Sequence, residues 1–575
     1  MSAGQHYRFG PFTFDGHGRV LLRDSKDLGL PPKAADTLNL LLEHAGSVVD
    51  KGTLLDSVWP GVVVGEGSLT RTVSILRKAL GGNDASRAYI ATVSKRGYRF
   101  VAPLDRGAAE EPAQSRTMLA VLPIENLSSS RRHDYFSDGL TEEMIAQLST
   151  LNPERLGVIA RTSSMMFKGT AKRIGEIGRD LGAHYIVQGS VRRERGRVRI
   201  AAQLIQVRDE THVWADTYER EAGDMLRLQC EVAQAIAREI QIKLTPRVAR
   251  RFTDTSDMPA ATYQAFLRGR HFLNQRTESG MRDSIAQFEA ALEHCPTHAP
   301  AYAGIADANV MLACRGMVPA RETFRRARSA ARRALDLDAE SGDARASLAH
   351  VRLHDWDWEG LDQDFRRATE LSPSHAIAYY WYGEYLMCQG RPEEAIATTE
   401  AAVRLDPLSP VIRSALGMIL YLARRYDRAS EVLVDAVETT PEHFLPHLRL
   451  GLVRIQQQRF ADAIRCLKLS TALASRSTET QAALAMAYAA SGERAKAARI
   501  VKQFERQRGK RYVLPYNIAK IHAAAKDRTR AFEWLETAYE GGNPDLIELN
   551  SEPLFDPIRD DKRFTHLMRR IGWSV

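Results

Sequence analysis

Residues 68–80 alternate apolar and polar side chains with the period of an α-helix. At about 100° per residue the apolar side chains fall on one narrow face, which is typical of a helix packed on a core; they are Leu69, Val73, Leu76 and Leu80. The opposite face is polar and basic and carries Thr70, Arg71, Ser74 and Lys78, with Arg77 on its flank. The glycine pair at 81–82 predicts the end of the helix.

A hairpin is predicted directly after this helix, over residues 89–100. Its basic residues are Lys95 and Arg96 at the tip and Arg99 in the second strand. Between residues 68 and 101 there are seven Lys or Arg against one acid. A polar helix face can bond to base edges, and hairpin cations can reach phosphates. An ordinary solvated surface is the alternative reading of a basic helix face.

The pattern before the basic helix predicts two further helices, over residues 32–45 and residues 51–59. Asp50 is expected to cap the second of these, and Pro60–Gly61 to stop it. Residues 7–22 alternate as short strands do. Three helices followed by a hairpin, with the third helix basic, indicate a winged helix-turn-helix that binds DNA.

Residues 7–102 resemble the winged helix of OmpR/PhoB-type transcription factors. The resemblance is carried by Leu54, Leu55, Val58 and Trp59, by LRKAL at 76–80 and by GYRF at 97–100. It implies that the third helix enters the major groove, where Thr70, Arg71, Ser74, Arg77 and Lys78 read bases or phosphates. It further implies wing contacts from Lys95, Arg96 and Arg99, and a phosphate contact from Trp59, for which core packing is the alternative.

Other positions of the same domain are read differently. Tyr98 and Phe100 are expected in the core of the hairpin. In some relatives the loop matching residues 62–67 contacts RNA polymerase, which is therefore a candidate partner. Here the loop departs from the family pattern, because it is glycine-rich and apolar.

Residues 117–246 alternate strand and helix patterns and end in a strand hairpin and a long helix, which predicts an α/β domain after a polar linker at 105–116. The segments VLPIENLS, YFSDGLTEEMIAQLS and LGAHYIVQGSVRR resemble TolB-N/FlgO domains. Asp138, Glu142 and Glu143 form an acidic cluster. We interpret them as first-turn acids that complement a helix dipole, with catalysis as the weaker alternative.

Residues 260–575, after a linker at 247–259, repeat every 34 residues. Three series keep this step: Ala395, Ala429, Ala463, Ala497 and Ala531; Gly383, Gly417 and Gly451; and Pro373, Pro407 and Pro441. A 34-residue period built from two helices is the tetratricopeptide pattern. We expect about eight repeats and an insertion that enlarges one turn near residues 314–320.

The stacked repeats should form a superhelix whose concave side binds a peptide or helix, with Arg413 and His447 as candidate groove residues. His443 and His447 have helical spacing but no third ligand, so we read them as surface histidines. The last helix of the chain is expected to cap the apolar end of the array.

The chain has 575 residues, a net charge of +9 and five scattered cysteines without a CxxC pair. This length requires several domains, and the charge suits a nucleic-acid partner. The cysteines indicate reduced thiols and no disulfide or zinc framework. Without an apolar run of about 20 residues, a soluble, cytoplasmic protein with no membrane partner is expected.

These patterns predict a multidomain α+β/α fold: a winged helix, a small α/β domain and an all-α superhelix. The order is similar to that of CadC/HilA-like bacterial regulators, without a transmembrane helix. The predicted function is sequence-specific DNA binding in transcription regulation, with the array sensing or binding a protein, a peptide or a second copy of the chain in signal transduction. No catalytic, cofactor or metal site is predicted. The alternatives are a scaffold whose winged helix binds protein, and an adenylate-cyclase-type enzyme.

Overall fold

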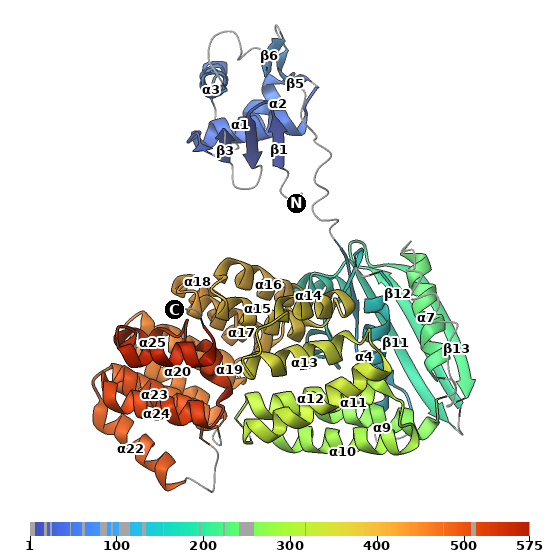
Figure 1. The fold of residues 1–575 in the computed structure, drawn as a ribbon. Helices are drawn as coiled ribbons and strands as arrows, with labels where there is room; N and C mark the ends of the chain where they lie inside the picture. The colour runs from blue at the N-terminus through green and yellow to red at the C-terminus, as the bar shows by residue number, and fades with distance from the viewer. Residues whose placement is uncertain are drawn as a thin grey trace. The chain divides into compact units, whose positions relative to one another are not determined.

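A computed structural model describes residues 6–573, apart from residues 16–19, 24–25, 47, 60–63, 81–88, 94–95, 103–115, 129–133, 153, 195–196, 222–224, 241–257, 317, 475–476 and 508–512. The chain divides into two compact units, Met1–Ser115 and Arg116–Val575 (Figure 1). In the described residues no helix combines the length and the apolar character that crossing a bilayer requires.

Unit 1 contains two small sheets and three helices. Its elements are β1 (His6–Phe9), β2 (Phe12–Asp15), β3 (Val20–Arg23), β4 (Lys26–Asp27), α1 (Pro32–Glu43), β5 (Val48–Asp50), α2 (Lys51–Val58), α3 (Glu66–Ala79), β6 (Ile90–Val93) and β7 (Gly97–Phe100). The first four strands form one antiparallel sheet, and the second sheet has the order β5-β7-β6. This is the predicted winged helix-turn-helix.

The predicted helix cap and the predicted core residues of the hairpin in unit 1 are confirmed. Asp50 caps α2 by accepting a hydrogen bond from the Thr53 amide at 2.9 Å. Tyr98 and Phe100 are buried in the core. The predicted stop signals Pro60–Gly61 and Gly81–Gly82 lie outside the described residues.

Unit 2 begins with a mixed sheet of order β10-β8-β11-β12-β13, and the short β9 pairs with β11. Its elements are β8 (Thr117–Val121), β9 (Glu125–Asn126), α4 (Asp134–Thr150), β10 (Leu156–Val158), α5 (Arg161–Met165), α6 (Ile174–Leu181), β11 (Tyr185–Glu194), β12 (Arg197–Gln206), β13 (Thr211–Glu221) and α7 (Met225–Glu239). Strands β10, β8 and β11 are parallel, and β11, β12 and β13 are antiparallel.

Alternate residues of β8 serve different cores. Leu119 and Val121 join a core with α4, α7 and the first array helices, whereas Ala120 packs with Ile177 of α6. This alternation follows from the two-residue repeat of a strand. The sheet and the beginning of the array therefore share one hydrophobic core.

The acids of α4 do not lie in its first turn, so our interpretation of them as capping residues is wrong. The helix begins at Asp134, and Asp138 forms an ion pair with Lys168 at 2.5 Å. Glu142 is buried and pairs with Arg161 at 3.4 Å and with Arg270 of the array. Burial of a carboxylate between two guanidinium groups ties the sheet to the array, because neither charge is stable alone in that setting.

A second junction joins the sheet to turns between later helices. The amide and the hydroxyl of Ser163 both donate to Asp406, at 2.9 and 2.6 Å, and the Leu408 amide donates to the Ser163 hydroxyl at 2.8 Å. The Ala160 amide donates to the Leu405 carbonyl at 2.7 Å. The array thus contacts the α/β part at positions about 240 residues apart in sequence.

The array consists of eight helix pairs in the described residues, as expected. They are α9 (Ala260–Leu273) with α10 (Glu278–His294), α11 (Ala299–Cys314) with α12 (Ala320–Leu337), α13 (Gly342–His354) with α14 (Leu361–Leu371), α15 (Ala376–Cys388) with α16 (Pro392–Leu405), α17 (Pro410–Leu422) with α18 (Tyr426–Thr439), α19 (Phe444–Gln456) with α20 (Phe460–Leu473), α21 (Thr478–Ala490) with α22 (Arg494–Arg506), and α23 (Pro515–Ala524) with α24 (Arg528–Glu540).

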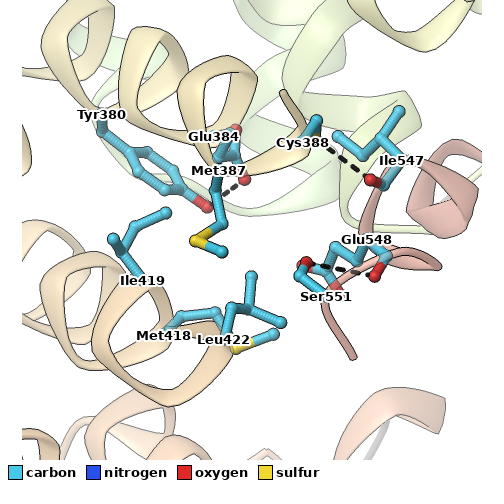
Figure 2. Close-up of a pocket in the computed structure, with 10 residues that line it drawn as sticks. All are labelled: Tyr380, Glu384, Met387, Cys388, Met418, Ile419, Leu422, Ile547, Glu548 and Ser551. Carbon is cyan, nitrogen blue, oxygen red and sulfur yellow. Dashed lines mark hydrogen bonds between the residues drawn. The ribbon is translucent and has the colours of Figure 1, made fainter. Parts of the chain in front are cut away.

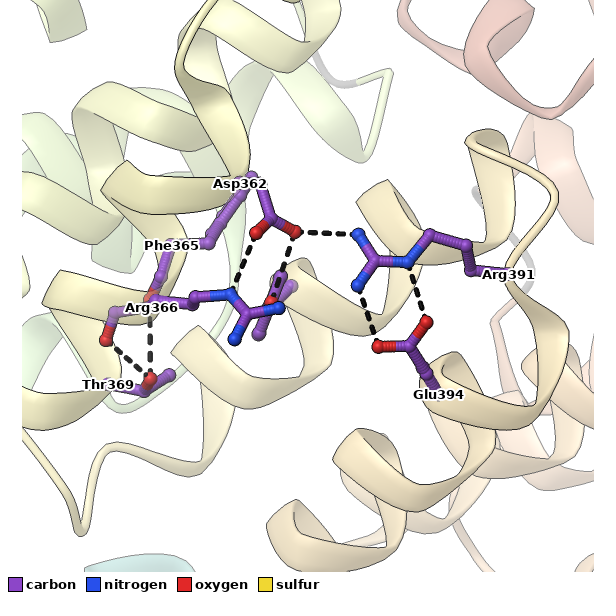
Figure 3. Close-up of polar contacts among 7 residues, drawn as sticks. Asp362, Phe365, Arg366, Thr369, Arg391 and Glu394 are labelled. Carbon is purple, nitrogen blue, oxygen red and sulfur yellow. Dashed lines mark hydrogen bonds and ion pairs between the residues drawn. The ribbon is translucent and has the colours of Figure 1, made fainter.

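The periodic glycines lie where the two helices of a repeat cross. A Cβ at Gly417 would come within 2.6 Å of Leu433, and one at Gly451 within 2.4 Å of Leu467. Only glycine allows this close approach. Polar contacts add to the packing between repeats, as Figure 3 shows: Asp362 accepts from Arg391 at 2.7 Å, and Arg391 also bonds to Glu394.

The expected insertion near residues 314–320 does more than enlarge a turn. Helix α11 has 16 residues and α12 has 18, against 13 and 14 in the pair α15 and α16. The extra residues therefore lengthen both helices, and the longer α11 ends at Cys314.

The C-terminal segment does more than cap the last repeat. Its elements are η4 (Pro544–Glu548), η5 (Pro553–Ile558) and α25 (Lys562–Ile571). η4 lies against α11, α13 and α15, and the Cys388 thiol donates to the Ile547 carbonyl at 3.0 Å (Figure 2). The Tyr421 hydroxyl bonds to the buried Glu552 at 2.6 Å. The segment thus covers the first helices of successive repeats.

The predicted groove residues are used inside the array. Arg413 donates to the Pro407 carbonyl at 2.5 Å and pairs with Asp435 at 2.7 Å. His447 is buried, and its Nε2 bonds to the Pro441 carbonyl at 2.9 Å, so the interpretation of it as a surface histidine is wrong. Both side chains bond to the turn that precedes their own helix, and Arg413 also pairs with the second helix of its repeat.

Candidate nucleic-acid interface

Helix α3 has one buried face and one exposed face. Leu69, Val73, Leu76 and Leu80 are at most 1 % exposed and join the core of unit 1. Thr72, also buried, bonds back to the Ser68 carbonyl at 2.9 Å. The exposed residues include Thr70, Arg71, Ser74 and Lys78. The fold therefore brings these four predicted readers together on one accessible face.

The two cations of this face keep their side chains available. Among the described residues, no hydrogen bond or ion pair engages the side chains of Arg71 or Lys78. They are seven residues apart, which places them on one face of the helix about 10 Å from each other. A major groove is about 12 Å wide, so the pair can span it.

Arg77 has a different environment, although it neighbours Lys78. Its Nη2 donates to the Ile90 carbonyl at 2.8 Å and to the Thr92 hydroxyl at 2.8 Å, and its Nε to the same carbonyl at 3.2 Å. The guanidinium thereby fixes α3 against β6. Sequence reasoning missed this bracing, although Arg77 follows Val73 by four residues and so lies beside the buried stripe.

The wing sheet depends on a glycine. A Cβ at Gly97 would meet the Val49 carbonyl oxygen at 2.0 Å, so β7 can approach β5 only without a side chain there. The turn before it is closed by the Arg96 amide, which donates to the Val93 carbonyl at 3.0 Å. Arg96 is exposed in this turn, and Lys95 lies outside the described residues.

The structure separates Arg99 from the α3 face. Because Tyr98 and Phe100 point into the core, Arg99 between them faces the other side of the sheet. It is half-buried, and its Nε has no hydrogen-bond partner among the described residues. Arg96 and Arg99 therefore lie in different environments of the wing.

Trp59 follows the last residue of α2. It is half-buried and packs against the core of unit 1. Lys33 donates to the neighbouring Val58 carbonyl at 2.6 Å and so stabilises the end of the helix. Core packing accounts for most of the indole environment, and its exposed part leaves room for a further contact.

The chain is similar to known regulators. Residues 25–100 match the family described as "Transcriptional regulatory protein, C terminal", and residues 363–410 and 414–474 match tetratricopeptide repeats. Transcriptional regulator HilA of Salmonella typhimurium is 27% identical over 79% of this chain and 79% of its own length. Transcriptional activator CadC of Escherichia coli is 39% identical over 16% of this chain and 18% of its own.

One relative has a name from another class. A Rhizobium meliloti protein, provisionally named adenylate cyclase 3, is 34% identical over 34% of this chain and 34% of its own length. Its alignment leaves two thirds of both chains unmatched.

Together, the family matches and the regulators show that the N-terminal unit is a regulator-type winged helix and that a tetratricopeptide array follows in the same chain.

Proposed function

We propose that this chain, which joins an OmpR/PhoB-type winged helix to a tetratricopeptide array, regulates transcription by binding specific double-stranded DNA through α3 and the wing. The observation that carries the proposal is the exposed face of α3 with Thr70, Arg71, Ser74 and Lys78, behind which the helix is wholly packed on the core. A rigid helix with an exposed polar face is the element that reads base edges in a major groove.

The residues divide into two roles. Arg71 lies in the N-terminal half of α3, the part that approaches the bases in helix-turn-helix complexes, so we assign it with Thr70 and Ser74 to base readout. Lys78, Lys95 and Arg96 are assigned to phosphates. Arg77 supports binding by holding α3 on β6, and Arg99 and Trp59 are secondary candidates for backbone contacts.

The array is proposed to bind a protein partner, and this binding is proposed to regulate the DNA-binding unit. Because η4 already lies on α11, α13 and α15, a peptide or helix entering there has to replace the chain's own C-terminal segment. RNA polymerase and a second copy of the chain are candidate partners. A regulatory role fits the size of the array, which far exceeds what DNA binding needs.

We do not assign an enzymatic reaction. The acids that might serve catalysis are engaged in structural ion pairs: Asp138 with Lys168, and Glu142 with Arg161 and Arg270. A cyclic-nucleotide assay of the full chain tests this directly, and product formation above a protein-free control would overturn the assignment.

The test of DNA binding is selection of bound fragments from the genome of the source organism, followed by affinity measurements at several salt concentrations. The full chain and unit 1, which has its own core, should enrich the same sequence. Log affinity should fall linearly with log salt, because phosphate contacts release counterions. A scaffold whose winged helix binds protein would enrich no sequence.

A further inference from the structure

Two helices of the array bring a thiol and two imidazoles together at one point. Cys314 ends α11, and His350 and His354 lie one turn apart on α13. The His354 Nε2 is 3.0 Å from the His350 Nε2 and 3.5 Å from the Cys314 sulfur. One ligand atom from each of the three residues lies within 4.8 Å of the other two.

Neighbouring groups hold the two imidazole rings in place, and they fix His354 in the tautomer that metal binding requires. The His354 Nδ1–H donates to the Pro544 carbonyl at 3.0 Å, which leaves a lone pair on the Nε2 that faces the cluster. Phe324 stacks on His354 at 5.2 Å, and Trp381 lies 4.2 Å from His350.

A carboxylate lies beside the cluster. The Glu384 Oε2 is 3.6 Å from the His350 Nε2 and has no hydrogen-bond partner among the described residues. Its other oxygen accepts from the Tyr380 hydroxyl at 2.5 Å, as Figure 2 shows. The His350 Nδ1 is likewise buried without a partner. Buried polar atoms without partners are uncommon, and both of these belong to the pair Glu384 and His350 at the cluster.

Two distances within the cluster fit a tetrahedral zinc site. With Zn–S near 2.3 Å and Zn–N near 2.0–2.1 Å, tetrahedral angles separate sulfur from nitrogen by about 3.6 Å and two nitrogens by about 3.4 Å. The observed 3.5 Å and 3.0 Å lie close to these values. Simple hydrogen bonding would also bring the three groups together, but it leaves the Glu384 oxygen unexplained.

We propose that Cys314, His350 and His354 bind a divalent ion of the zinc class, and that the Glu384 carboxylate beside His350 moves toward them to supply the fourth ligand. Thiolate and imidazole ligands favour zinc over magnesium or calcium. The ion displaces the Cys314 proton to solvent, and its charge compensates the thiolate and the buried carboxylate. It links α11, α13 and α15, the same helices that η4 contacts.

The test uses the full chain, stripped with a chelator and titrated with Co²⁺ as a spectroscopic substitute for Zn²⁺. One Co²⁺ per chain should bind, with the strong visible bands of four-coordinate cobalt and a thiolate-to-cobalt charge-transfer band. Zn²⁺ should displace it and raise the unfolding temperature. A wild-type chain that binds no cobalt, or only cobalt with weak six-coordinate bands, would overturn the proposal whatever the variants do.

Variants locate the site. Cys314→Ser should abolish the charge-transfer band, and His354→Gln should weaken cobalt binding by at least about tenfold, the lower end of what even indirect ligand supports contribute. Cys466→Ser, which changes another half-buried cysteine on α20, is the matched control and should bind as wild type. A charge-transfer band that persists in Cys314→Ser and is lost in Cys466→Ser would contradict the assignment.

Discussion

Replacing Arg71 or Lys78 with alanine is the most direct perturbation of the proposed DNA interface. Both side chains are exposed on α3, and no described residue pairs with either. Their removal should therefore change the folding free energy by no more than about 0.5 kcal/mol. Each loss should instead weaken operator binding by about 1–2 kcal/mol, or roughly 5- to 30-fold.

The two variants should differ in what they lose. The Arg71 position is about two helical turns before Lys78, near the end of α3 that approaches base edges. Arg71→Ala should relax the sequence preference, whereas Lys78→Ala should weaken binding to all sequences alike. If Lys78 meets a phosphate, its removal lowers the slope of log affinity against log salt by about 0.9.

Fluorescence anisotropy with a labelled operator, at four or more salt concentrations, measures both quantities. Lys502→Ala is the matched control, because it removes one exposed charge from α22 in the other unit. It should leave affinity and slope unchanged. Wild-type affinity and slope in both α3 variants would refute the assignment of this face to DNA.

Three further changes test the structural roles of single residues. Arg77→Ala should lower the unfolding free energy of unit 1 by about 1–2 kcal/mol, since its bonds to the Ile90 carbonyl are lost; a thermal melt that matches wild type would contradict the bracing role. Glu142→Gln should lower the unfolding free energy of unit 2 by about 3 kcal/mol in urea, because it removes the carboxylate that pairs directly with the buried Arg270; an unchanged midpoint would rule out this junction. Burial and nearby carboxylates raise the pKa of Glu548, so the folded state binds more protons than the unfolded state, and stability should fall as pH rises above about 4.5; Glu548→Gln should flatten that slope in urea titrations across pH.

The sequence predicted most of the architecture because periodicity records which face of an element is buried. The spacing of Leu69, Val73, Leu76 and Leu80 predicted the third helix and its buried face. The 34-residue repeat likewise predicted the helix pairs of the array. Gly417 and Gly451 were found as part of the 34-residue series, and the close approach to Leu433 and Leu467 explains why they recur. These are local or strictly periodic constraints, which a single sequence displays.

Pairings between distant segments were not predictable in the same way. Asp138 and Glu142 were assigned to a first helical turn, because the start of α4 was placed too late and the partner Arg270 is 128 residues away. Arg413 and His447 were expected in a groove, yet their own repeats consume their hydrogen bonds. A sequence shows that a side chain is polar, whereas the partner that satisfies it depends on tertiary contacts.

The cysteine and histidine cluster had one visible signal, the four-residue spacing of His350 and His354 on a helix. Counting cysteine pairs could not reveal it, because Cys314 supplies the only thiol and comes from another repeat. Its position follows from the lengthened α11. The insertion noticed in the repeat pattern was thus a clue to chemistry as well as to length.

The proposed metal site and the C-terminal segment are physically linked through one hydrogen bond. The Pro544 carbonyl of η4 fixes the tautomer of His354, so the ring presents its lone pair to a metal only while η4 stays in place. Displacing η4 must then lower metal affinity, and by thermodynamic reciprocity a bound metal must strengthen the attachment of η4 by the same free energy. A partner that replaces this segment therefore competes with the ion as well as with the chain itself, and the array can respond to both.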